Sequence, residues 1–189
     1  MSNIASTKKQ GNRLKIGFST SLLQIADAAN AAEAALTNAL LLCAQRIGAE
    51  GAESAIARVR DGDASACNYW QYALAGQVAE YLGTLDQDVK AVYLCEYDAT
   101  PEDIAFSEMK PMAPIHLMVW VRRKTAALNS VVAALDRALV DTCRKRMGTP
   151  QLALLLDVQV IDDDDVERRA GYAAMISSLH HKPIQIWTR

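Results

Sequence analysis

An uninterrupted helical pattern from Thr20 to Ile47 restricts most strongly what this chain can fold into. Alanine has the highest helix propensity of all residues, and seven of the ten residues 26–35 are alanine. A serine or threonine can cap the start of this helix, and Gly48 can end it. At about 1.5 Å per residue the helix would be roughly 40 Å long. That length is more than a compact core of a 20.6 kDa chain needs.

A heptad-like stripe of apolar and small side chains runs along this helix. Its members alternate in steps of three and four residues, and they are Leu22, Ile25, Ala29, Ala32, Leu36, Ala39 and Cys43. Small side chains at the centre of the stripe allow another helix to approach closely. The stripe therefore packs either on a helix of the same chain or on a copy of itself. The second arrangement makes helix 20–47 the expected interface with a homo-oligomer or a protein partner.

Turn signals and a change of periodicity divide the chain into three parts. Residues 1–18 form a basic arm that we expect to be flexible, residues 19–65 form a helical N-terminal region, and residues 66–189 form an α/β domain. Glycines at 83 and 148 mark two expected helix ends. Beyond helix 20–47, the pattern predicts helices at about 52–60, 63–82, 125–147 and 162–180, and strands at 89–97, 115–121, 152–161 and 184–187.

The strands of the third part resemble those of a known family. Helix 68–82 leads into Val92–Tyr97 (VYLCEY), a second strand reads Ile115–Trp120 (IHLMVW), and a third reads Leu154–Ile161 (LLLDVQVI). This order resembles the minimal nucleotidyltransferase fold, the small bacterial type related to kanamycin and DNA polymerase β nucleotidyltransferases. The resemblance covers about residues 66–189. Together with helix 20–47, it leads us to expect an α/β protein whose helical N-terminal region packs on a small mixed β-sheet flanked by helices.

The motifs that carry the chemistry of that family are not intact. The Gly-Ser pair that would hold a triphosphate falls on Glu96 and Tyr97, and a carboxylate there would repel phosphate. The Asp-x-Asp pair that would hold Mg²⁺ falls near Pro114 and His116. Only Asp157 remains, at the third acidic position. The resemblance therefore implies a domain that is inactive in nucleotidyl transfer and acts by binding or assembly.

Two alternatives keep a ligand in the site. In the first, Glu96, Asp98 and Asp157 rebuild a displaced site for Mg²⁺, and the protein is a divergent metal-dependent enzyme of nucleotidyl or phosphoryl transfer. Without that activity we expect no cofactor and no metal.

In the second alternative the vestigial cleft binds a small molecule. His116, Met118 and Trp120 alternate along one strand, so they share one face of the sheet and would line that cleft.

Composition excludes several other classes. The chain has 20 basic and 22 acidic residues and a formal net charge of -2, which argues against nucleic acid as a partner. No apolar run approaches the length of a membrane span, and the polar start does not read as a signal peptide, so we expect a cytoplasmic protein. The four cysteines are widely spaced without a CxxC pair. They are expected to be buried free thiols rather than zinc ligands.

Overall fold

The computed structural model describes residues 17–95, 113–180 and 182–189, with side chains described from Asp27 onward. The basic arm predicted for residues 1–18 lies almost wholly outside these residues. The described chain is a mixed α/β protein, as expected, in which one four-stranded sheet has the order β3-β2-β1-β4. No described helix is both long and apolar enough to cross a membrane.

The sheet combines antiparallel and parallel pairs. β1 lies between β2 and β4 and is antiparallel to both, whereas β3 is parallel to β2 and forms one edge of the sheet. The strands are β1 (Val89–Leu94), β2 (Ile115–Val121), β3 (Leu156–Ile161) and β4 (Ile184–Thr188).

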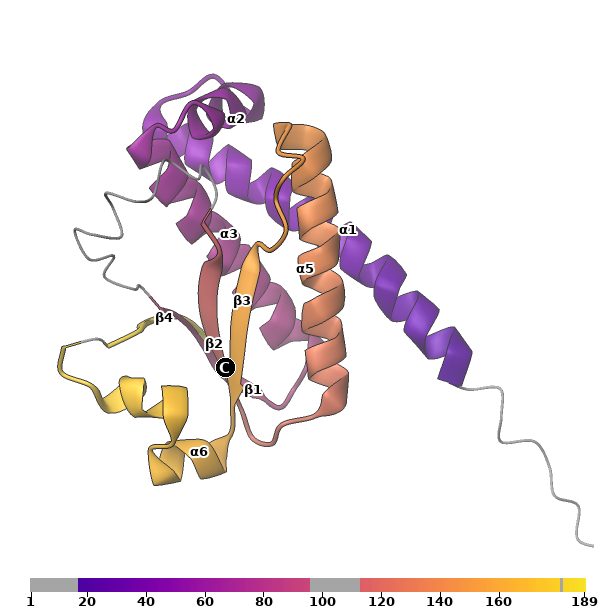
Figure 1. The fold of residues 1–189 in the computed structure, drawn as a ribbon, viewed down its shortest axis with the longest axis vertical. Helices are drawn as coiled ribbons and strands as arrows, with labels where there is room; N and C mark the ends of the chain where they lie inside the picture. The colour runs from indigo at the N-terminus through magenta and orange to yellow at the C-terminus, as the bar shows by residue number, and fades with distance from the viewer. Residues whose placement is uncertain (1–16, 96–112, 181) are drawn as a thin grey trace, which may run out of the picture.

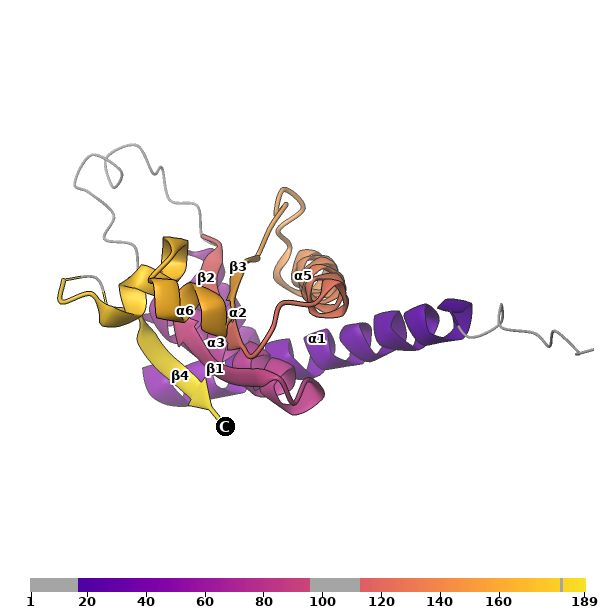
Figure 2. The ribbon, with the colours of Figure 1, turned by 90° about the horizontal axis from the view of Figure 1, so that it is seen from below.

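Helices cover both faces of this sheet. The larger core lies on the face covered by α1, α3 and α5, and a smaller core lies under α6 and the 3₁₀ helix η1 on the opposite face (Figures 1 and 2). Alternate residues of β1 and β2 point into the two cores, as the pleat of a strand requires. The helices are α1 (Gly17–Ile47), α2 (Ala52–Arg60), α3 (Ala64–Leu85), α5 (Ala126–Met147), α6 (Asp163–Arg168) and η1 (Gly171–Ser177).

The Ala-rich helix α1 packs within its own chain. Ala32, Leu36, Ala39 and Cys43 have no exposed surface, and α1 contacts both α3 and α5 along this part. The small side chains allow both helices to approach closely. Of the two expected arrangements, the C-terminal half of the stripe therefore shows packing on helices of the same chain. Ala29, in contrast, is exposed, and the N-terminal end of α1 projects beyond the body of the molecule (Figures 1 and 2).

Side chains cap the starts of α3 and α5, and a glycine ends α5. The Asp63 side chain accepts a hydrogen bond from the backbone N–H of Ala66 at 2.9 Å, and the Thr125 hydroxyl accepts one from Leu128 at 3.2 Å. Gly148 ends α5 with a φ of 67°.

Gly83 was expected to end α3, and that prediction is wrong. The helix continues to Leu85, and Gly83 lies inside it beneath the ring of Trp187 from β4. The guanidinium of Arg189 lies over the same ring and donates from Nη2 to the carbonyl of Gly83 at 2.5 Å. Glycine at this position therefore serves the docking of the C-terminal strand on α3.

Gly83→Ala is expected to destabilise the protein by about 1–3 kcal/mol, because the new methyl group would overlap the Trp187 ring and force it to move. Gly76→Ala on the same helix is the matched control. A methyl group there meets open space, so alanine is expected to stabilise the helix by about 0.5–1 kcal/mol. Urea unfolding measures both values. Equal effects at the two positions would contradict the packing of Trp187 on Gly83.

The single helix predicted for 162–180 is also wrong. The helix does start there, where Asp162 and Asp165 form a reciprocal capping box. The helix nevertheless ends at Arg168, because Arg169 adopts a left-handed φ of 51° and Gly171 does the same. The chain then continues as the 3₁₀ helix η1, which turns the segment back over the sheet.

The third strand begins at Leu156, later than the predicted Leu152. One carboxylate oxygen of Asp136 on α5 accepts the backbone N–H groups of Leu155 at 3.0 Å and Leu156 at 2.8 Å. These two hydrogen bonds occupy the backbone N–H groups at the start of β3, where its pairing with β2 begins. All four cysteines are free, as expected, and three of them are buried.

Candidate functional site

The residues expected to line a cleft share one face of β2, as predicted. Met118, however, has no exposed surface and packs with Tyr93, Ile161 and Ala173 in the core beneath η1. The middle of this face is therefore filled by protein. A ligand could reach Met118 only if α6 and η1 moved away.

His116 and Asp157 form the polar end of that face. They are register partners on β2 and β3, and His116 Nδ1 lies 3.0 Å from Asp157 Oδ2. The second carboxylate oxygen accepts a hydrogen bond from Gln159 Nε2 at 3.2 Å. Both side chains of the pair are about one-third exposed. The carboxylate orients the imidazole ring and is itself held by two neighbours.

Cys95 lies next to this pair, opposite His116 across β1 and β2, where its backbone N–H donates to the His116 carbonyl at 2.9 Å. Burial raises the pKa of the Cys95 thiol, and the charge of Asp157 raises it further. The sulfur is therefore protonated at neutral pH, and a thiol is a poor nucleophile. The row of Cys95, His116 and Asp157 does not have the electrostatics of a catalytic thiolate.

The predicted carboxylate cluster cannot be assembled from the described residues. Glu96 and Asp98 lie outside them, and Asp157 is the only member of the cluster that the structure places. Within the described parts of the chain, no group of three His, Cys, Asp or Glu side chains is arranged to hold a metal ion.

Trp120 and two acidic residues of α6 hold α6 and η1 against this face of the sheet, and we call these two helices the cover. Trp120 Nε1 and Lys90 Nζ both donate to Asp163 Oδ1 at 2.8 Å, and Lys90 lies 4.5 Å from the centre of the Trp120 ring. Asp165 pairs with Lys124 in the same way. The hydrogen bond from Lys90 lowers the pKa of Asp163, and the one from Lys124 lowers the pKa of Asp165. These contacts give Trp120 a structural role.

The contacts of Asp163 predict an acid-sensitive cover. A carboxyl group whose pKa is lowered on folding stabilises the fold above its unfolded pKa, near 3.8, and that contribution is lost as the pH falls through the lower, folded pKa. Hydrogen exchange in residues 163–177 should therefore accelerate between about pH 5 and pH 2, after correction for intrinsic exchange rates. Asp163→Asn should show faster exchange already at pH 7.

The matched control for this experiment is Asp164→Asn. Asp164 lies in the same helical turn, but it pairs only with Arg168 of α6 and makes no contact with the sheet among the interactions of the described residues. If both variants exchange alike at pH 7, Asp163 does not fasten the cover.

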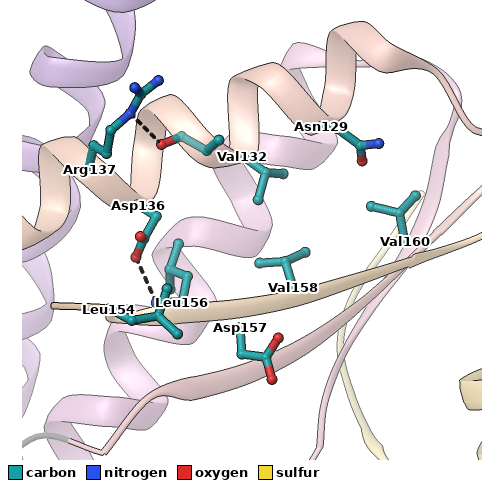
Figure 3. A pocket seen from close by; sticks show the side chains of 10 residues that line it. Asn129, Val132, Asp136, Arg137, Leu154, Leu156, Asp157, Val158 and Val160 are labelled. Carbon is teal, nitrogen blue, oxygen red and sulfur yellow. Dashed lines mark hydrogen bonds between the residues drawn. The ribbon is translucent and has the colours of Figure 1, made fainter.

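An open groove lies on the other side of β3. It measures about 610 Å³ and separates α5 from the edge strand. The side chain of Asp157 points away from it, toward the opposite face (Figure 3). Apolar side chains form most of its walls. The lining residues are Asn129, Val132, Ala133, Asp136, Arg137, Leu154, Leu156, Asp157, Val158 and Val160.

The groove stays open because the polar side chains of α5 do not cross it. Arg137 donates from Nε to the carbonyl of Ala133 on its own helix at 3.1 Å, and Asp136 is occupied with the start of β3 (Figure 3). Val158 and Val160 are consequently only partly buried, and Leu154 is 45% exposed. An apolar wall that no described part of the chain covers is a typical feature of a binding surface.

The outer edge of β3 runs along this groove. The Ile115 N–H donates to the Leu155 carbonyl at 2.8 Å, so that carbonyl faces β2. Backbone groups alternate in direction along a strand. Asp157 and every second residue after it therefore bond to β2, whereas the N–H and C=O groups of Val158 and Val160 point outward. No other described strand pairs with this edge.

The two edges of the sheet differ in their protection. β4 follows Pro183 and contains an irregularity in its register with β1, and Arg189, the residue after it, folds back on α3. β3 has regular register, no proline and no lysine. Proline, lysine and bulges are the usual devices that prevent another strand from pairing with an edge. β3 therefore retains the ability to pair with a further strand.

Reasoning from the sequence did not find this surface. The run from Leu156 to Ile161, with one acidic and no basic residue, carried the available signal, but the order of the strands was needed to show that it forms an edge. The fold and this surface define a mixed α/β protein whose edge strand β3 pairs with β2 alone among the described strands. Comparisons with protein-family models, with curated proteins and with solved structures found no match for this chain.

Proposed function

We propose that this chain is a binding or assembly protein, built on a nucleotidyltransferase-like fold that lacks nucleotidyl-transfer chemistry. We further propose that it binds an extended protein segment, which pairs with the outer edge of β3. The observation that carries the proposal is the unprotected edge beside an apolar groove. The element order helix, strand, strand, helix, strand supports the fold assignment, since the resemblance rests on that order.

Strand addition uses both features of the surface. The outward N–H and C=O groups of Val158 and Val160 would bond to the backbone of the added segment, and its apolar side chains would enter the groove against α5. Backbone hydrogen bonds supply affinity in this mode, and the groove supplies selectivity for apolar residues at alternate positions.

Two features argue against nucleotidyl transfer. Asp157 is hydrogen-bonded to His116 and Gln159, and the described residues place no group of three His, Cys, Asp or Glu side chains that could hold a metal ion there. The adjacent face is covered at Met118. We therefore expect no stabilisation by ATP, GTP, CTP or UTP, with or without Mg²⁺ or Mn²⁺. A thermal shift that needs both nucleotide and metal and is lost in Asp157→Asn would instead support the enzyme alternative.

The Ala-rich helix is a less extensive interface than its stripe suggested. Its residues from Ala32 to Cys43 are used inside the chain, so an interface on α1 would have to use the projecting N-terminal part. That part remains a second possible contact for a partner.

Strand addition can be tested with a synthetic peptide of residues 154–162, labelled with fluorescein, because it contains the apolar alternation that the groove accepts. Fluorescence anisotropy should show binding to the full chain. Val158→Pro should weaken binding, because it removes an outward N–H that no described strand uses, and leaves the bonds to β2 intact.

Val158→Thr is the control, since it keeps the N–H group and a β-branched side chain. It should bind the peptide with nearly the wild-type affinity. Circular dichroism confirms that both variants fold. If Val158→Pro and Val158→Thr bind equally, the peptide does not pair with this edge.

A further inference from the structure

We infer that the segment added to β3 is β3 of a second copy of this chain, in a symmetric dimer whose two sheets join edge to edge with antiparallel β3 strands. The inference rests on the proposed function, because it names the partner for the same edge.

A two-fold axis perpendicular to the sheet restricts the possible registers. Residues directly opposite each other in an antiparallel pair point to the same face of the sheet. Leu156, Val158 and Val160 face the groove, whereas Asp157 and Gln159 face the other side. Each face of one copy must meet the same face of the other. The axis must therefore lie between the two copies of a single residue, so that this residue is opposite itself.

Charge selects among the remaining registers. An axis at Asp157 would place two carboxylates opposite each other, which is destabilising. An axis at Val158 places Asp157 opposite Gln159 of the other copy, where the amide can donate to the carboxylate. An axis at Gln159 would instead place Asp157 opposite the apolar Ile161 of the other copy. The register centred on Val158 is therefore the complementary one.

The same register pairs the outward backbone groups at the centre of the edge. With the axis at Val158, the two copies of this residue exchange both of their N–H and C=O groups, and each Val160 N–H meets the carbonyl of the partner's Leu156. The Leu156 N–H stays with Asp136, which accepts it at 2.8 Å, so the outward Val160 carbonyl of the other copy is left to solvent. The apolar side chains of Leu156 and Val160 then lie opposite each other over the joined grooves.

Pairing of β3 with the opposite edge of another copy is less favourable. The edge of β4 is irregular and preceded by Pro183. A contact between two different edges also does not close, so it would build an open-ended filament. The symmetric contact closes at two copies.

Light scattering coupled to size exclusion tests the state of the full chain. The wild type is expected at twice 20.6 kDa. Val158→Pro should dimerise roughly 10- to 100-fold more weakly, since two hydrogen bonds at the axis are lost. Leu179→Pro is the control, because Leu179 is 93% exposed and belongs to no strand, and this variant should stay dimeric. Dimerisation that is equal in all three proteins would overturn the inference.

A gain-of-function variant tests the register itself. Opposite residues in a hydrogen-bonded antiparallel pair have Cα atoms about 5.5 Å apart, which suits a disulfide. Val158→Cys, in a Cys67→Ser background, should form a covalent dimer with oxidised glutathione, whereas Leu179→Cys should not. Equal crosslinking of both variants would contradict a two-fold axis at Val158.

The two proposals fail separately. If the wild-type chain stays monomeric at about 100 μM but binds the 154–162 peptide, the dimer is overturned and strand addition stands. A chain that stays monomeric and does not bind the peptide would overturn both. A dimer that survives in Val158→Pro would place the contact between copies elsewhere.

Discussion

Ala32→Glu is expected to destabilise the protein by about 4 kcal/mol or more, which is enough to unfold many domains of this size. Ala32 has no exposed surface and lies where α1 packs against its own chain. A glutamate there would bring a charge into an apolar contact that contains no described partner for it. Burial of an unpaired charge is among the most costly single changes.

Ala29→Glu on the same helix provides the control. Ala29 belongs to the same predicted stripe, but it is exposed, so its substitution should change the free energy of unfolding by less than about 0.5 kcal/mol. Urea unfolding followed by circular dichroism measures both variants. If Ala32→Glu folds with wild-type stability, α1 does not pack on its own chain as the structure describes.

Trp70→Ala is expected to cost about 3–5 kcal/mol, because Trp70 is the largest of the fully buried side chains and its removal leaves a cavity. Trp70→Phe should cost much less, about 1 kcal/mol. The Trp70 Nε1–H is buried and has no hydrogen-bond partner among the described residues. Phenylalanine removes that unsatisfied donor, and the relief offsets part of the lost packing.

Tyr69→Ala is the neighbouring control. Tyr69 is 46% exposed, so its loss should change stability by less than about 1 kcal/mol. Thermal and urea unfolding of the three variants give the order of the effects. A loss in Trp70→Phe as large as that in Trp70→Ala would contradict an unsatisfied indole nitrogen at this core position.

The parts of the fold that sequence could predict are those that depend on near neighbours. The caps at Asp63 and Thr125 follow from side chains that bond within the same helical turn, and the alternation in β2 follows from the pleat. Gly83 misled the prediction because its role depends on Trp187, which reaches it from the far end of the chain. Glycine reads as a helix end unless the tertiary neighbour is known.

The candidate site was less predictable for a similar reason. The shared face of His116, Met118 and Trp120 was predicted correctly, but its cover by η1 depends on the left-handed turn at Arg169, a residue type that rarely adopts it. The groove depends on the separation of α5 from β3, and the edge depends on strand order. Neither quantity is encoded in a short stretch of residues.

Amide hydrogen exchange at Val158 and Val160 is the most direct test of the proposed binding edge. In an isolated chain these two amides point outward and should exchange rapidly, while Asp157 and Gln159 are protected by β2. We expect Val158 and Val160 to become protected as the protein concentration rises. The Val158→Thr variant should show the same protection as the wild type. Rapid exchange of both amides at every concentration, with the 154–162 peptide present or absent, would contradict this expectation.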